Sequence, residues 1–75
     1  MSKQPKCPFK DAIVGDKPEI VSNPYTGQSC ELPPEAVATY DVLKGAEMLG
    51  QHHIVRIGLD WFIDNYPKEY MTLLD

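Results

Sequence analysis

The sequence predicts an α+β fold in which an N-terminal β-hairpin packs on two or three α-helices. Two short strand-like segments flank a turn at 23–27, and helical periodicity begins at Pro34. A later run, 52–66, carries apolar residues around most of a helix. Because 75 residues suit one domain, we assign residues 1–18 to an extended N-terminal arm and residues 19–75 to a single small domain.

The arm is rich in proline and lysine, which favours extended chain. Within it, the apolar residues Ala12, Ile13 and Val14 predict a short additional strand. Gly15 and Asp16 then predict a turn that leads the chain into the hairpin.

The hairpin is predicted from two segments, 19–22 and 28–32, and from the residues between them. The side chain of Asn23 is suited to bonding backbone amides at the start of a turn, and Pro24 fixes φ near −65°. Gly27 accommodates positive φ, so a loop of four or five residues is expected. An isolated hairpin is marginal in water, and this one therefore needs the helices or a third strand.

The first helix is expected over residues 34–49. Proline is favoured in a first turn, Glu35 suits the positive end of the helix dipole, and Gly50 is a suitable stop. Gly45 lies inside this helix, where it weakens the helix and is expected to allow close packing. The apolar face at helical spacing consists of Val37, Tyr40 and Leu43, with Val42, Ala46 and Leu49 nearby.

The second helix is the run at 52–66, which Tyr66 and Pro67 end. A short third helix is expected over residues 67–74, with its inward face formed by Tyr70, Leu73 and Leu74.

The second helix has only a narrow charged stripe, because Arg56, Asp60 and Asp64 recur every four residues. Its two apolar flanks exceed what one short chain readily covers, so we predict self-association as a symmetric dimer. The competing interpretation is that the third helix and the arm cover the second flank within one chain. The predicted interface consists of Ile54, Ile57, Trp61, Tyr66 and Tyr70. Aromatic residues here suit a core and an interface about equally.

Composition limits the partners. The net charge of −4 and pI of about 4.9 disfavour nucleic acid, which is bound through lysine and arginine. No segment approaches the ~18 apolar residues of a membrane span, so no membrane partner is expected. The N-terminus leads into no apolar segment of the kind found in signal peptides, so we expect a cytoplasmic protein.

No pattern of catalytic or metal-binding residues stands out, so we expect no enzyme activity, cofactor or metal. The four candidate zinc ligands are Cys7, Cys30, His52 and His53, but zinc sites usually contain close pairs of cysteines. Since nothing directs export, both cysteines are expected to be free thiols.

Three segments of the chain, residues 23–27, 32–41 and 66–75, resemble small uncharacterised proteins of tailed bacteriophages. The resemblance spans roughly residues 20–75 and leaves out the arm. It implies a phage origin and action in an infected bacterial cell, with no catalytic residue or cofactor to carry over.

Two functions follow as hypotheses. The first is a non-enzymatic protein–protein interaction module that modulates a host or phage protein. The alternative is a structural or assembly accessory protein of the phage particle, and abundance in purified particles would separate the two.

Overall fold

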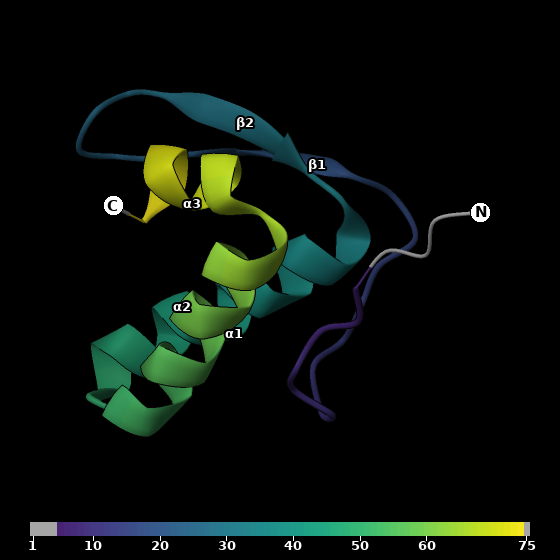
Figure 1. Ribbon diagram of the computed structural model, residues 1–75, viewed down its shortest axis with the longest axis vertical. Coiled ribbons are helices and arrows are strands. Elements are labelled where there is room, and N and C mark those ends of the chain that lie inside the picture. The colour runs from purple at the N-terminus through teal and green to yellow at the C-terminus, as the bar shows by residue number, and fades with distance from the viewer. Residues whose placement is uncertain (1–4, 75) are drawn as a thin grey trace.

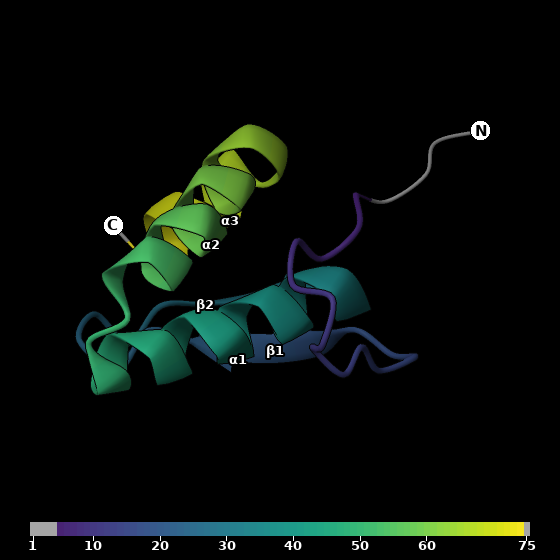
Figure 2. The ribbon, with the colours of Figure 1, turned by 90° about the horizontal axis from the view of Figure 1, so that it is seen from below.

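The computed structural model describes residues 5–74 and contains a hairpin followed by three helices (Figure 1). The predicted α+β fold is thereby confirmed. The elements are β1 (Glu19–Ser22), β2 (Ser29–Leu32), α1 (Pro34–Leu49), α2 (His52–Asn65) and α3 (Pro67–Leu73). Figure 2 shows α2 and α3 lying over a layer formed by α1 and the hairpin.

The hairpin is antiparallel and has the expected turn. Val21 pairs with Cys30, and the backbone N–H of Asn23 donates to the carbonyl of Gln28 at 2.7 Å. Alternation along β2 turns Cys30 and Leu32 toward the helices, and Leu32 is completely buried.

The buried side chain of Asn23 connects this turn to the C-terminal helix. Its Nδ2 donates to the carbonyl of Thr72 at 3.0 Å, and its Oδ1 accepts from the N–H of Tyr25 at 2.9 Å. The hairpin is therefore fixed to α3 as well as packed on α1, as its marginal stability in isolation requires.

The ends of the helices follow the sequence signals. Pro34 begins α1, and Gly50 closes it with a positive φ of 72°. The N–H of Gln51 then reaches back to the carbonyl of Ala46 at 2.9 Å, which satisfies an orphan acceptor of the last turn. Tyr66 leaves helical geometry at φ −139°, and Pro67 starts α3 in a new direction.

The core lies between α1 and α2 and is closed by β2 and α3. Its buried side chains are Leu32, Ala36, Tyr40, Leu43, Phe62 and Leu73. Tyr70 and Leu74 pack against this cluster, which confirms the inward face predicted for α3. Leu49, in contrast, was expected on the apolar face of α1 but is 75% exposed in the last turn of that helix.

The closest approach of two helices is at Gly58 and not at Gly45. A Cβ atom at Gly58 would lie 2.7 Å from Cδ1 of the buried Leu43, whereas one at Gly45 would meet nothing within 4 Å. The expectation that Gly45 allows close packing is wrong because that residue faces solvent.

The arm forms no strand at residues 12–14, so that prediction is also wrong. No strand of the hairpin pairs with this segment, and Ile13 is 93% exposed. Earlier in the arm, the carbonyl of Lys6 accepts from Nε1 of Trp61 at 2.7 Å, and the N–H of Cys7 donates to Glu35 Oε1 at 3.3 Å. Residues 1–4 of the predicted arm and residue 75 of the predicted domain lie outside the described residues.

Candidate functional site

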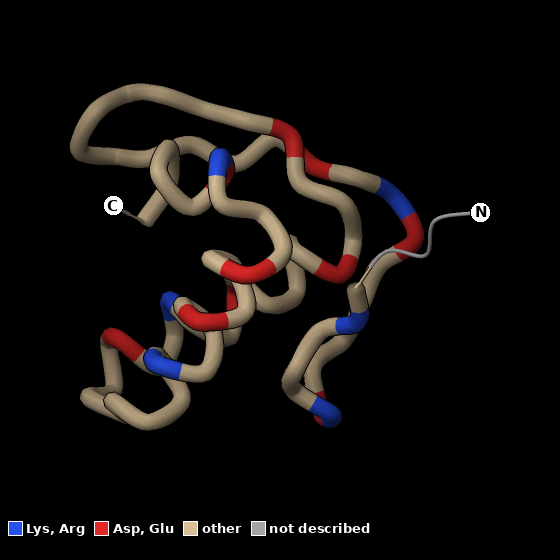
Figure 3. Tube along the Cα trace, viewed as in Figure 1, with Lys and Arg blue, Asp and Glu red and all other residues tan. Residues whose placement is uncertain are grey.

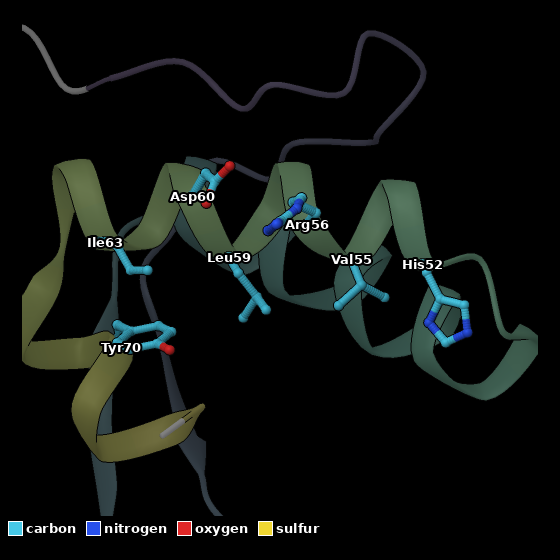
Figure 4. A pocket seen from close by; sticks show the side chains of 7 residues that line it. All are labelled: His52, Val55, Arg56, Leu59, Asp60, Ile63 and Tyr70. Atoms are coloured by element: carbon cyan, nitrogen blue, oxygen red, sulfur yellow. The ribbon is translucent and has the colours of Figure 1, made fainter.

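A groove of about 340 Å³ runs along α2 and is closed at one end by α3 (Figure 4). Its floor consists of apolar side chains that are half-buried or, at Ile63, 46% exposed, and charged side chains line one edge. The lining residues are His52, Val55, Arg56, Leu59, Asp60, Ile63 and Tyr70.

Helical periodicity builds the floor. Val55, Leu59 and Ile63 are spaced by four residues and therefore stack along one side of α2. Tyr70 reaches this side because the break at Tyr66 turns α3 back beside α2. Figure 4 shows the Tyr70 ring beside Ile63 at one end of the groove and the His52 ring at the other.

The charged edge of the groove is formed by Arg56 and Asp60, one helical turn apart and both exposed. Asp64 continues this charged stripe one turn further along α2. Figure 3 shows basic and then acidic segments in succession along this helix. Within residues 5–74, the one ion pair joins Lys44 and Glu47 at 3.0 Å. Arg56 and Asp60 are therefore not paired with each other or with another side chain of this described region.

The predicted interface residues occupy three environments. Ile54 and Trp61 are half-buried on the flank of α2 that the arm approaches, and Ile57 is 46% exposed. Tyr66 and Tyr70 are half-buried and pack against the core, and Tyr70 also lines the groove.

The arm covers much of the flank that contains Trp61. Besides the bond from Trp61 to Lys6, Phe9 and neighbouring arm residues share a hollow with Val42 of α1 and Ile54 of α2. The ring of Trp61 also packs edge-on against Phe62, with centroids 5.2 Å apart. The arm therefore contacts this flank, as the competing interpretation expected of it, whereas Tyr70 of the third helix lies at the groove, and self-association stays a prediction.

Three apolar residues of the groove, Val55, Leu59 and Ile63, were not among the predicted interface residues. The four-residue spacing of these three residues was the available signal. This signal was ambiguous, because the side of α2 that faces the core is set by the contact of Gly58 with Leu43 of α1.

A second apolar surface lies where the hairpin turn approaches the end of α1. Tyr25 is 92% exposed and Met48 is 88% exposed, and together with Pro24 they line a hollow of about 400 Å³. The two charged residues of this hollow, Lys44 and Glu47, form an ion pair with each other at 3.0 Å. The hydrogen bond from Lys44 to Glu47 raises the pKa of Lys44.

The groups considered for metal binding or nucleophilic chemistry lie apart. Cys7 and Cys30 are half-buried free thiols, and the two histidines are exposed. Burial raises the pKa of the Cys30 thiol, and the nearby negative charge of Glu69 adds to this effect. In the described part of the chain, no three His, Cys, Asp or Glu side chains gather into a potential metal site.

No helix among residues 5–74 has the length and apolar character needed to cross a membrane. No protein-family model matches the chain, and no curated protein or solved structure shows significant similarity to it.

Proposed function

We propose that this chain is a non-enzymatic, phage-encoded protein–protein interaction module that modulates a host or phage protein in the bacterial cytoplasm. The observation that carries the proposal is the groove on α2. An apolar floor beside exposed charges resembles the layout of protein interfaces, in which an apolar centre is surrounded by a polar rim. The phage origin rests on the resemblance of residues 23–27, 32–41 and 66–75 to phage proteins.

The form of the groove favours a protein segment as its occupant. Its floor follows two turns of a helix, and helices commonly bind such surfaces with apolar side chains spaced by three or four residues. Arg56 and Asp60 are placed to orient such a segment by charge. The acidic character of the whole chain argues against nucleic acid in the same position.

Site-specific photo-crosslinking tests this proposal. A photoreactive amino acid replaces Ile63, which lines the groove and is 46% exposed, and the variant is expressed in a bacterial host during phage infection. The matched control carries the same amino acid at Lys17, which is exposed in the arm. We expect discrete crosslinked protein adducts from position 63 and none from position 17. Absence of adducts at position 63, or equal adducts at both positions, would contradict a binding function for the groove.

A further inference from the structure

We infer that the groove binds a second copy of this chain, with the two α2 helices antiparallel about a twofold axis level with residue 58. This inference rests on the proposed binding function and names its partner. Three observations carry it: the order of charges along α2, the absence of partners for these charges within the described chain, and the shape of the groove.

The order of charges matches an antiparallel pairing of α2 with itself. In such a pair, residues equally far before and after the level of the axis lie opposite each other. An axis at residue 58 places Arg56 opposite Asp60 of the second copy, and symmetry repeats the pair. The same axis brings His52 opposite Asp64 of the second copy. The pair formed by residues 52 and 64 and the pair formed by residues 56 and 60 therefore require the same register.

Among residues 5–74, neither of these charges forms an ion pair with another side chain. Arg56 and Asp60 are exposed, and the ion pair found within residues 5–74 uses two other side chains. A different partner would have to carry a complementary pair at the same spacing, whereas a second copy supplies it by symmetry. Parallel packing would instead set Arg56 against Arg56 and Asp60 against Asp60, and like charges across an interface are strongly unfavourable.

The shape of the groove leads to the same arrangement. Tyr70 fills the side next to Ile63, while the end near Val55 and His52 is not covered by α3 (Figure 4). The twofold axis carries Tyr70 of each copy to the open end near Val55 of the other. Ile63 would then be buried in the contact, and the floor of each groove would be covered.

Exchange of charges tests this register directly. Arg56→Glu sets a carboxylate against Asp60 of the second copy, and Asp60→Arg sets a guanidinium against Arg56 of the second copy. Each variant alone therefore meets repulsion twice. We expect sedimentation to show a dimer for the unmodified chain, and a dissociation constant raised at least about tenfold for each variant. An equimolar mixture of the two variants forms a mixed pair in which both contacts again join opposite charges.

The mixture has a defined outcome because the two contacts of the mixed pair differ from those of either variant. One contact joins the two substituted side chains, a carboxylate and a guanidinium, and the other joins the native Asp60 and Arg56. Both contacts are attractive, so we expect the mixture to regain a dimer of unmodified affinity.

Two control variants carry the same changes in net charge away from the groove. Lys17→Glu lies in the arm and Asp41→Arg lies on α1, both at exposed positions. They are expected to dimerise like the unmodified chain, alone and in mixture. Circular dichroism checks that all four variants are folded.

Each remaining outcome overturns the inference. A monomeric unmodified chain at near-millimolar concentration would remove the second copy as the partner, even where Ile63 crosslinks to another protein and the binding function stands. Dimers that tolerate both single variants would place the interface elsewhere. Loss of dimer in the mixture as well as in the single variants would exclude the antiparallel register.

Discussion

On one flank of α2, Gly58 and Phe62 pack against α1, whereas on the other flank the N-terminal arm lies over Trp61. The first contact joins two regular elements and excludes solvent completely from Phe62. The second is made by irregular chain through a bond from Nε1 of Trp61 to the carbonyl of Lys6, and Ile13 of the same arm is 93% exposed. The difference indicates that α2 is fixed in place by its α1 flank and shielded on its arm flank.

The largest effect is expected on the α1 flank. Phe62→Ala removes a fully buried ring from the centre of the core, and such truncations cost about 3–5 kcal/mol of unfolding free energy. Ile57→Ala is the control in the same helix, because Ile57 is 46% exposed and should cost about 1 kcal/mol or less. Urea unfolding followed by circular dichroism measures both, and equal losses would contradict the asymmetry of α2.

A pair of glycine substitutions sharpens the comparison further. Gly58→Ala forces a methyl group to 2.7 Å from Cδ1 of Leu43, which is fully buried and whose Cβ and Cγ atoms also lie only 3.2 Å from the new Cβ atom. Gly45→Ala adds the same methyl group in open space on α1, where it should raise stability by about 0.5–1 kcal/mol. Replacement of glycine by alanine favours the helical state equally at both positions, so the difference between the two variants reports the steric cost at Gly58. We expect Gly58→Ala to be less stable than Gly45→Ala by about 1–3 kcal/mol.

The arm flank should respond more weakly. Trp61→Phe keeps an aromatic ring but removes the donor that bonds Lys6, and the lost hydrogen bond is worth about 0.5–1.5 kcal/mol. Tryptic cleavage after Lys6 and Lys10 should accelerate in this variant, because the arm has lost a tether. Tyr66→Phe serves as the control, since no hydrogen bond joins its hydroxyl to other described residues. Unchanged cleavage in Trp61→Phe would show that this bond does not hold the arm.

The smallest effect is expected from the pH dependence of stability. Burial raises the pKa of Cys30 above its ordinary value of 9.0, so the folded chain holds this proton more tightly than the unfolded chain. Stability is then unaffected by this group below about pH 9 and falls as the pH rises through the raised value. The pKa values of Tyr66 and Lys44 are also raised, so their contributions are lost in the same direction at higher pH. Urea midpoints measured from pH 7 to 11 check this, and in Cys30→Ala the fall should begin at a higher pH.

Local chemistry made much of the fold predictable. Pro34 and Gly50 bound α1 as expected, and Tyr66 with Pro67 separates α2 from α3, because these residues restrict the backbone at their own positions. The strand expected at residues 12–14 failed for the opposite reason. A strand needs a neighbour, and β propensity in a single segment carries no information about whether one is available.

The candidate site was less predictable because it depends on the rotation of α2 about its axis. Apolar residues on most sides of the helix left open which face meets the core. Gly58 settles this by allowing Leu43 to approach, and the groove then falls on the side of Leu59 and Ile63. Of the predicted interface residues, Tyr70 alone lines that groove.

The bond between Asn23 and Thr72 also has a consequence for the order of events during synthesis. The two strands of the hairpin are close in sequence and can meet soon after they leave the ribosome. Their turn cannot be anchored until residue 72 has been made, because Nδ2 of Asn23 donates its hydrogen bond to the carbonyl of Thr72, 49 positions later. Because an undocked hairpin is marginal, stable docking of the hairpin has to follow the synthesis of residue 72, and the nascent chain exposes β1 and β2 until then.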